Sequence, residues 1–480
     1  MAQEREQLIT KREDDFSKWY QDIIDVAELA EHGSVKGTMV IKPYGYSIWE
    51  NMQHVLDLMF KSKDVKNAYF PLFIPESFLK KEAEHVEGFS PEVAVVTHAG
   101  GKKLEEPLIV RPTSETIIND SFSRWVKSYR DLPLLINQWV NIVRWEMRPR
   151  LFLRTTEFLW QEGHTVHASK EDAENRVSMM LDVYKKFMEE YLAIPVISGE
   201  KSEAEKFAGA DYTTSIEAMM QDGKALQSGT SHMLGQNFAK AFNVQFLNEQ
   251  GEQEYGWQTS WGVSTRMIGG LIMVHSDDKG LVLPPKIAPI HAVIVPIFSN
   301  EKEKEEVLSS AKDIAEKLEA EDLKITLDDR DMRPGPRFFE WEKKGVPVRI
   351  EIGPKDVKSN SVVLVRRDTA EKETIKQDDC LKRIPELLED IQKNLFDKAF
   401  KFREENTFEV SSWDEFKETI KNKPGFINTY WCGNPDCEEK IKKESKATIR
   451  CIPFNQDKSQ GKCIYCGKDS DKKVIFAKAY

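Results

Sequence analysis

The residues with the clearest chemical potential lie in LIVRPTSETI, residues 108–117. Three apolar residues, typical of the end of a strand, lead into Arg111 and Pro112 and then into Thr113, Ser114 and Glu115. A carboxylate and several hydroxyls between two apolar stretches are costly to desolvate unless a partner needs them. Taken alone, the segment is more simply explained as an ordinary polar turn.

Arginines gather in VRWEMRPRLFLRTTEFLWQEGH, residues 143–164, which reads as two strands joined by the basic turn MRPR. A hairpin that places Arg144 and Arg154 on one face could grip a polyphosphate, because guanidinium groups match phosphate oxygens bidentately. Alternation along a strand would put Glu146 on the same face as Arg144. A salt-bridged surface hairpin is the competing explanation. No phosphate loop of the GxxxxGK[ST] type occurs in the sequence, so a nucleotide would be held in another way.

Two further stretches combine small and polar residues. In GVSTRMIGG, Thr265 and Arg266 stand where a strand gives way to an apolar helix, and an arginine there could meet a phosphate at the helix N-terminus. An ordinary cap followed by a surface arginine explains the same pattern. In QSGTSHMLGQNF, the turn with Gln227, Thr230 and His232 could form the wall of a polar pocket, although a single histidine is more often structural.

Cysteines are concentrated in the last fifty residues. CGNPDC and CIYC contain Cys432, Cys437, Cys463 and Cys466, two close pairs that predict a tetrahedral, structural zinc site. Cys451 lies between the pairs and could replace one ligand. Unligated buried cysteines are the alternative.

The segment RPGPRFFEWEKKGVPVR, residues 333–349, is locally basic and interleaved with aromatic residues. Such a combination suits unstacked RNA bases. A solvated helix face with a buried aromatic seam fits it equally well.

Hydrophobic periodicity defines the elements that must position these residues. A helix is expected in residues 47–62, a second through roughly 170–192, and a strand feeding an apolar helix around 260–275. The proline-rich stretch 281–290 reads as a linker. Strands and helices alternate beyond it, which predicts an α/β domain with a mostly parallel sheet. We therefore expect three domains, with limits at 1–287, 288–400 and 401–480.

Composition restricts the class of protein. The 480 residues are 40% hydrophobic and 31% charged, as in globular proteins, and the net charge of −11 argues against a generally basic nucleic-acid coat. No stretch is apolar enough for a transmembrane helix, and the charged first residues do not resemble a secretory signal. We expect a cytoplasmic protein with no membrane partner.

Taken in order, the motifs resemble those of class II aminoacyl-tRNA synthetases. RPTSET, RWE, FLRTTEFLWQEGH, GTSHMLGQNF and KGVPVRIEIGP are similar to prolyl-tRNA synthetases of the archaeal and eukaryotic-like type, and the similarity extends through the cysteines to Tyr480. The resemblance implies an α+β catalytic domain, built on an antiparallel sheet flanked by helices. An α/β anticodon-binding domain and a small α+β zinc-binding domain would follow. It also implies a homodimer formed through the first motif.

The implied reaction joins L-proline and ATP into prolyl-adenylate and then transfers prolyl to the 3′ end of tRNA(Pro). By resemblance Arg144 and Arg266 are catalytic, and Mg²⁺ accompanies ATP. The proline pocket would contain the residues Thr113, Glu115, Arg144, Trp160, Glu162 and His232. The ATP site would contain Arg144, Glu146, Arg154, Thr155, Phe158, Gln227, Thr230 and Arg266. Glu342 and Arg349 match positions that read anticodon guanines, and the C-terminus is expected to fold back toward the catalytic domain.

Three features qualify the resemblance. Thr156 stands where some relatives have a basic residue, and the turn MRPR is short. No room exists between the second and third motifs for the large editing insertion of many bacterial relatives, so uncorrected activation of alanine or cysteine is expected.

A class II enzyme for threonine, serine or glycine, and a non-catalytic RNA-binding relative, are the competing hypotheses. TSE with GTSH argues against the first, and the intact Arg144, Glu146 and Arg266 argue against the second.

Overall fold

A computed structural model describes residues 9–83, 93–146, 148–456 and 459–480. The first eight residues of the charged N-terminal stretch and Met147, in the predicted basic turn, lie outside the described residues. None of the helices in the described ranges combines the length and the hydropathy that a bilayer span needs.

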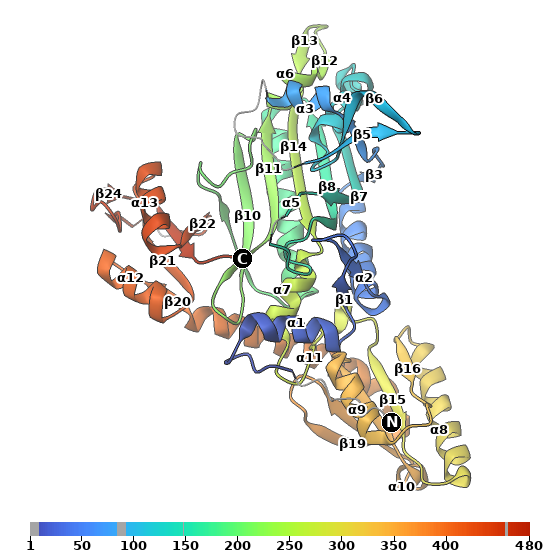
Figure 1. The fold of residues 1–480 in the computed structure, drawn as a ribbon. Coiled ribbons are helices and arrows are strands. Elements are labelled where there is room, and N and C mark those ends of the chain that lie inside the picture. The colour runs from blue at the N-terminus through green and yellow to red at the C-terminus, as the bar shows by residue number, and fades with distance from the viewer. Residues whose placement is uncertain (1–8, 84–92, 147, 457–458) are drawn as a thin grey trace.

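A long sheet forms the centre of the molecule (Figure 1). Its catalytic part is antiparallel from β7 to β9, and the short β3 adds a parallel edge. In spatial order its strands are β3 (Lys66–Asn67), β7 (Leu134–Val143), β8 (Glu157–His167), β14 (Trp257–Ser264), β11 (Ala225–Gly235), β10 (Tyr212–Met219) and β9 (Val196–Glu200). The predicted antiparallel class II sheet is confirmed.

Helices pack on both faces of this sheet. Successive side chains of a strand point to opposite faces. Accordingly Leu135 packs with the core around α2, α5 and α7, whereas Ile136 packs with the core around α4 and α6. The helices are α1 (Phe16–Val26), α2 (Pro43–Lys61), α3 (Glu76–Ala83), α4 (Glu115–Trp125), α5 (Lys170–Glu190), α6 (Asn237–Phe242) and α7 (Arg266–His275). The helices expected at 47–62, 170–192 and after residue 264 correspond to α2, α5 and α7.

Gly163 on β8 leaves room for a large side chain of the neighbouring strand. A Cβ atom added to Gly163 on β8 would lie 2.0 Å from the ring of Trp261 on the neighbouring β14. Trp261 is buried in the core beneath α5. Because the odd-numbered residues of β8 face α5, the even-numbered Trp160, Glu162 and His164 face the opposite side, where the cavity described below lies.

Small antiparallel sheets complete the catalytic region. One lies beside the start of α4 and brings residues 108–110 next to residues 73–75. Their strands are β1 (Ala30–His32) with β2 (Met39–Ile41), β4 (Phe73–Pro75) with β6 (Lys102–Val110) and β5 (Ala94–Ala99), and β12 (Gln245–Leu247) with β13 (Gln253–Tyr255).

The second region, residues 291–405, is an α/β unit below the catalytic sheet in Figure 1. Its five-stranded sheet has the order β16-β15-β17-β18-β19, in which two neighbouring pairs are parallel and two are antiparallel. The predicted mostly parallel sheet is therefore wrong, because β17, β18 and β19 follow one another as a meander. The elements are β15 (Ala292–Pro296), α8 (Glu301–Glu319), β16 (Ile325–Leu327), α9 (Pro334–Lys343), β17 (Val348–Ile352), α10 (Pro354–Lys358), β18 (Ser361–Arg366), β19 (Lys372–Lys376) and α11 (Cys380–Glu405).

The proline-rich stretch between the two regions is packed rather than exposed. Leu281, Leu283 and Ile287 are buried in the catalytic core, and Val282 is buried in the core of the second region. The prolines thus stiffen a buried connection between two cores.

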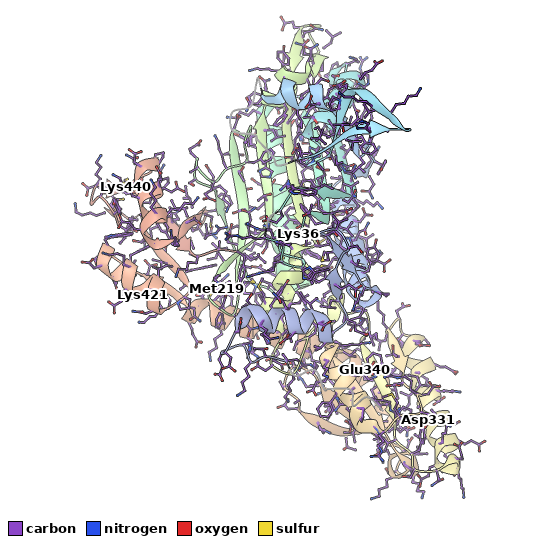
Figure 2. The ribbon with its side chains drawn as sticks, viewed as in Figure 1. Lys36, Met219, Asp331, Glu340, Lys421 and Lys440 are labelled. Carbon is purple, nitrogen blue, oxygen red and sulfur yellow. The ribbon has the colours of Figure 1, made fainter. Side chains whose placement is uncertain are left out.

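The third region continues the catalytic sheet. Ile452 on β22 pairs with Glu200 on β9, so the central sheet extends through β22, β25, β21 and β20 to eleven strands among the described residues. Figure 2 shows Met219 at this junction, where it packs with buried residues of the C-terminal strands. The elements are β20 (Thr407–Glu409), α12 (Trp413–Asn422), β21 (Phe426–Tyr430), α13 (Pro435–Ser445), β22 (Thr448–Pro453), β23 (Gly461–Lys462), β24 (Asp469–Ser470) and β25 (Lys473–Ala477).

Candidate active site

A cavity of about 560 Å³ opens above the even-numbered residues of β8, beside β11, β14 and the start of α7. Every residue that was predicted to hold the amino acid or the nucleotide lines it. These residues are Thr113, Glu115, Arg144, Glu146, Arg154, Thr155, Phe158, Trp160, Glu162, Gln227, Thr230, His232 and Arg266. The structure therefore brings together residues that are 153 positions apart in the sequence, from 113 to 266.

Arg111 fixes the loop that carries the first polar cluster. Its side chain is buried and donates to the carbonyl of Phe70 at 2.7 Å, to the carbonyl of Asn141 at 2.9 Å and to Oδ1 of Asn141 at 2.8 Å. Its backbone N–H donates to the carbonyl of Leu72. These bonds tie the end of β6 to the segment before β4 and to β7, and so set the direction in which residues 113–115 leave the strand.

Glu115 is buried at the first turn of α4 and accepts a hydrogen bond from the hydroxyl of Thr113. Burial raises the pKa of Glu115, and the nearby carboxylate of Glu162 raises it further, whereas His164 and Thr113 oppose the rise. The pocket thus stabilises a charged Glu115 incompletely. A cationic ligand would supply the missing positive charge.

Glu162 is buried in the same cavity but has a full set of donors. The hydroxyl of Ser114 donates to Oε1 at 2.5 Å, the amide of Gln138 donates to Oε1 at 2.6 Å, and Nε2 of His164 lies 3.0 Å from Oε2. Burial alone would raise the pKa of Glu162. The hydrogen bond and the positive charge of His164, together with the bonds from Ser114 and Gln138, outweigh burial and hold the pKa of Glu162 below its ordinary value. The ion pair between His164 and Glu162 also raises the pKa of His164, although burial of the imidazole acts in the opposite direction.

His232 differs from His164 because it has no carboxylate partner among the described residues. Its Nδ1 lies 2.9 Å from the hydroxyl of Thr213, and its ring centroid lies 4.8 Å from that of Phe207. Burial and the charge of His164 lower the pKa of His232 to about 3. The imidazole is therefore neutral at physiological pH and forms an uncharged wall of the cavity.

Arg144 and Arg266 supply positive charge to the same cavity. In the part of the chain that the structure describes, neither guanidinium forms an ion pair. Arg144 donates to the carbonyl of Pro112 at 2.9 Å and lies over the ring of Trp160, 5.2 Å from its centroid. Burial, together with the charges of Arg144 and Arg154, lowers the pKa of Arg266 to about 10. Cations without a carboxylate in direct contact are the feature expected of an anion site.

Arg154 and Glu146 lie at the mouth of the cavity, 3.7 Å apart, and the Arg154 side chain is about half exposed. The exposed pair is a weak interaction that an incoming phosphate could replace. At the start of α7, the hydroxyl of Ser264 accepts from the N–H of Arg266 at 3.2 Å, whereas Thr265, the N-cap residue, makes no side-chain cap bond. The first N–H of the helix is therefore bonded by Ser264.

Two buried polar atoms of residues that line the cavity lack a hydrogen-bond partner among the described residues. Nε1 of Trp160 and the hydroxyl of Ser260 are both without a hydrogen bond. Buried polar groups in native proteins are nearly always satisfied, so such atoms point to a ligand or water in the functional state.

The connection between β7 and β8 differs from the prediction. The strands end at Val143 and begin again at Glu157, so residues 144–156 form a thirteen-residue connection instead of the short turn MRPR. The predicted short turn is wrong, because residues 150–154 fold back as a second, tight turn in which the N–H of Arg154 donates to the carbonyl of Arg150. Thr156 is buried and its N–H donates to the carbonyl of Gly37, so it makes no contribution to the cavity lining.

Sequence reasoning missed the residues that hold the ligand-facing groups in place. Ser114, Gln138 and His164 fix Glu162, while Thr213 and Phe207 fix His232. Ser114 and His164 stand inside quoted motifs, and two-residue alternation places His164 on the same face as Glu162. Gln138 and Phe207 carried no such signal.

In the second region, Glu342 and Arg349 line one small cavity of about 100 Å³ with Trp341, Arg366, Arg367 and Lys372. Arg349 donates to Glu351 at 2.8 Å and lies over the ring of Phe338. The aromatic residues of α9 are mostly structural, because Phe338 and Trp341 pack against Val293, Val295 and Val346. Phe339 alone of the three is exposed.

The four predicted zinc ligands are brought together in the third region. The sulfur atoms of Cys432, Cys437, Cys463 and Cys466 all lie within 4.8 Å of one another, and those of Cys432 and Cys466 are 3.7 Å apart. Tetrahedral zinc with Zn–S bonds of about 2.3 Å requires sulfur separations of about 3.8 Å, so the four residues fit the ion. Cys451 lies elsewhere, buried at the junction with the catalytic sheet, and the predicted exchange with a ligand has no support.

The C-terminus folds back onto the catalytic region, as expected. The N–H of Tyr480 donates to the carbonyl of Ala225 at 3.1 Å, and its hydroxyl donates to Asp222 at 2.6 Å. The guanidinium of Arg150 lies over its ring. The last residue is therefore part of the framework around the connection between β7 and β8.

Comparisons with known proteins cover most of the chain. Residues 97–275 match the model of the tRNA synthetase class II core domain (G, H, P, S and T). Residues 291–387 match an anticodon binding domain, and residues 413–480 match the C-terminal region of prolyl-tRNA synthetase.

Full-length relatives agree with these matches. The chain is 56% identical to a proline–tRNA ligase of Porphyromonas gingivalis, with 100% of both chains covered. It is 57% identical to that of Chloroherpeton thalassium, over 98% of this chain and 99% of the relative. Among solved structures, prolyl-tRNA synthetase from Cryptosporidium parvum, complexed with halofuginone and AMPPNP, is 42% identical with a TM-score of 0.95 over 99% of both chains. With identity at this level over the full length and with the cavity residues in place, the chain belongs to the prolyl-tRNA synthetase family.

Proposed function

We propose that the cavity activates L-proline with ATP to prolyl-adenylate and then transfers prolyl to the 3′ end of tRNA(Pro). The observation that carries the proposal is one cavity with an incompletely neutralised carboxylate, Glu115, and two arginines without ion-pair partners, Arg144 and Arg266. A zwitterionic amino acid and a polyphosphate have the complementary charges. The ligase activity itself follows from the family.

Proline binds at the end of the cavity formed by residues 113–115. Its secondary ammonium offers two N–H donors and a positive charge, for which Glu115 and Thr113 are acceptors. The faces of Trp160 and neutral His232 fit the methylene groups of the pyrrolidine ring, since neither side chain carries charge into that part of the cavity. Glu162, held by Ser114, Gln138 and His164, adds negative potential behind the amine.

ATP binds at the arginine end. Arg144 contacts the α-phosphate, and Arg154 and Arg266 contact the outer phosphates. Glu146, Thr155 and Phe158 border the adenine, with Gln227 and Thr230 beside the nucleotide. The Cryptosporidium parvum enzyme was solved as a complex with AMPPNP, which supports a nucleotide in the equivalent cavity here.

The chemistry of activation needs no general base, because the carboxylate of proline is already an anionic nucleophile. Arg144 orients the two substrates, since its Nε bond to Pro112 ties the phosphate-facing group to the loop of the proline pocket. Its charge also offsets the negative charge that builds on the α-phosphate during attack. Mg²⁺, held mainly by the phosphates, would neutralise part of the phosphate charge.

The second and third regions serve the tRNA and the fold. Glu342 can accept from the N1 and N2 protons of a guanine and Arg349 can donate to O6 and N7, so we assign anticodon reading to these two residues. Zn²⁺ in the four-cysteine site is structural, because no open coordination position remains.

We also propose an assembly and a location for the enzyme. Tyr69, Phe73 and Trp125 are exposed aromatic residues near the first polar cluster, and we propose that they contribute to a homodimer interface. We place the enzyme in the cytoplasm and keep the domain limits 1–287, 288–400 and 401–480. The second limit cuts α11, which runs to Glu405 and joins the two C-terminal regions.

The function is tested by amino-acid-dependent exchange of pyrophosphate into ATP, followed by aminoacylation of tRNA(Pro). We expect proline to give the fastest exchange, with slower activation of alanine or cysteine. Hydrolysis of alanyl-tRNA(Pro) is expected to be absent. Exchange that threonine, serine or glycine stimulates more than proline would assign the cavity to another class II enzyme, and the lack of any exchange would favour a non-catalytic relative.

A further inference from the structure

The loop that follows α7, residues 276–281, lies against the second region. Gly280 approaches α9 so closely that an added Cβ atom would lie 2.5 Å from Cα of Lys343, and its φ is +143°. The N–H of Leu281 donates to the carbonyl of Lys343 at 3.0 Å. The loop therefore contacts the C-terminal end of α9, next to Glu342.

A bidentate ion pair lies at the centre of this contact. The Arg367 guanidinium donates to both carboxylate oxygens of Asp277, at 2.7 and 2.9 Å. The Arg367 side chain is 4% exposed and that of Asp277 is 35% exposed, so water screens the pair only from one side. Burial raises the pKa of Asp277, but the bonds and charge of Arg367 outweigh it and lower the pKa.

The same guanidinium also holds a residue of the proposed anticodon pocket. Nε of Arg367 donates to the backbone carbonyl of Glu342 at 2.9 Å. Arg367 itself lines the small cavity that contains the Glu342 and Arg349 side chains. A base that shifts the Glu342 backbone therefore acts on a carbonyl that is bonded to Arg367, the partner of Asp277.

At the other end, Asp277 is two residues beyond His275, the last residue of α7. Arg266, the first residue of α7, faces the ATP end of the cavity. The helix is almost entirely buried, and Nε1 of Trp19 donates to the carbonyl of Asp277 while Gln221 donates to that of Ser276. A ten-residue helix is about 15 Å long. The helix α7 therefore links Asp277, just beyond its C-terminal end, to Arg266 at its N-terminal end.

We propose that Asp277 and Arg367 are positioning residues that couple occupation of the Glu342–Arg349 pocket by a tRNA base to the placement of Arg266 over the substrates. The proposal rests on the anticodon role of Glu342 and Arg349 given above. The coupled groups are joined by direct bonds throughout, from the Glu342 carbonyl through Arg367 and Asp277 to α7. Such coupling is a free energy shared by two sites, typically worth about 5- to 150-fold in affinity or rate.

The chain offers a matched control in the adjacent residue. Asp278 is exposed and bonds to Arg12 of the N-terminal segment, at 3.0 Å from its N–H and at 3.3 Å from Nε. It has no described contact with the second region. Asp277→Asn and Asp278→Asn therefore make the same chemical change in the same loop, and only the first weakens the link to Arg367.

The experiment compares wild type, Asp277→Asn, Arg367→Lys and Asp278→Asn. Two activities are measured: proline-dependent pyrophosphate exchange without tRNA, and the kcat and KM of aminoacylation. The second assay uses tRNA(Pro) and a variant whose anticodon guanines are replaced by adenines. For Asp277→Asn we expect exchange within about twofold of wild type. We expect the preference in kcat for the natural anticodon to fall about tenfold or more. Arg367→Lys should behave like Asp277→Asn, and Asp278→Asn like wild type.

Three results would overturn the proposal. In the first, Asp277→Asn keeps the wild-type preference in kcat for the natural anticodon. In the second, Asp277→Asn loses pyrophosphate exchange in the absence of tRNA. In the third, Asp278→Asn loses the preference in kcat as Asp277→Asn does. Glu342→Ala distinguishes a failure of the Asp277–Arg367 link from a failure of the anticodon role. If this variant loses anticodon preference while Asp277→Asn keeps it, the link alone is wrong. If the wild type shows no preference between the two tRNAs, the anticodon role fails and the link fails with it.

Discussion

Nε of Arg144 donates a hydrogen bond to the backbone carbonyl of Pro112 at 2.9 Å. The bond joins the residue after β7 to the loop that carries Thr113 and Glu115, so the arginine proposed to bind phosphate and the carboxylate proposed to bind the amine are held by one connected support. In the described part of the chain this carbonyl is the sole hydrogen-bond acceptor of the Arg144 guanidinium. Its remaining donors are therefore available to a ligand in the cavity.

Replacement of Arg144 by alanine should slow proline-dependent exchange about 100- to 1,000-fold in kcat, since it removes a preorganised positive group from the developing phosphate charge. Arg148→Ala is the matched control, because Arg148 is an exposed arginine of the same connection and does not line the cavity. Steady-state exchange kinetics measure both variants. Equal losses in the two variants would contradict the assigned role of Arg144.

Proline binding should depend on the ionisation of Glu115. The pKa of Glu115 is raised in the free protein, chiefly by burial, and the ammonium of proline binds the carboxylate form. Affinity should therefore be constant at high pH and fall about tenfold per pH unit as the pH drops below the raised pKa. Calorimetric titration of proline across this range measures the effect.

Glu115→Gln is the control for this pH dependence. The variant should bind proline about 10- to 150-fold more weakly at high pH, through loss of a charge-assisted hydrogen bond, and its affinity should not vary with pH in the same window. If the variant retains the pH dependence, another group is responsible. If it retains the affinity, the amine does not bind at Glu115.

The junction between the catalytic and C-terminal regions should depend on a buried ion cluster. Glu217 on β10 is fully buried and is bonded to Lys201 at 2.7 Å and to Arg450 on β22 at 3.1 Å. Glu217→Gln leaves two buried cations with reduced compensation, so we expect a loss of about 3–5 kcal/mol in the stability of the junction.

Thermal unfolding and limited proteolysis between the regions measure this loss. Glu439→Gln in α13, which removes an exposed partner of Lys443, should leave both unchanged. An unchanged melting temperature in Glu217→Gln would show that the cluster does not stabilise the junction.

Metal content tests the four-cysteine site. Purified protein should contain one zinc ion per chain, and Cys437→Ser should lower both the zinc content and the melting temperature of the C-terminal region. Cys451→Ala should retain the zinc, because Cys451 lies outside the cluster. Elemental analysis gives the metal content, and loss of zinc in Cys451→Ala would contradict the ligand assignment.

The sequence predicted the parts of the site that are set by local pattern. The pattern of a strand followed by an apolar helix placed Arg266 at the start of α7, and the ordered motifs identified the family and, by resemblance, assigned Trp160 and Glu162 to one pocket. Strand alternation did not hold for Arg144 and Glu146, because β7 ends at Val143. The long connection between β7 and β8 was not predicted, because the tight turn at 150–154 depends on tertiary contacts of Tyr20 and Tyr480 rather than on turn residues.

Long-range partners were also outside the reach of pattern. Nothing in the local sequence of Gln138 marks it as a donor to Glu162, 24 residues away, and Arg367 pairs with Asp277 across two regions. The sheet of the second region was wrongly predicted to be mostly parallel. The hydrophobic pattern of a strand is the same in a meander and in a strand–helix alternation, so it does not show that β17, β18 and β19 pair antiparallel.

The most direct test of the two-ended cavity is a crystal structure of the protein with a non-hydrolysable sulfamoyl analogue of prolyl-adenylate. The account predicts the pyrrolidine nitrogen within hydrogen-bond distance, about 2.7–3.2 Å, of Thr113 or Glu115. It also predicts the sulfamoyl group at Arg144 and the adenine beside Phe158. An analogue bound with its pyrrolidine nitrogen away from Glu115, or outside this cavity, would contradict it.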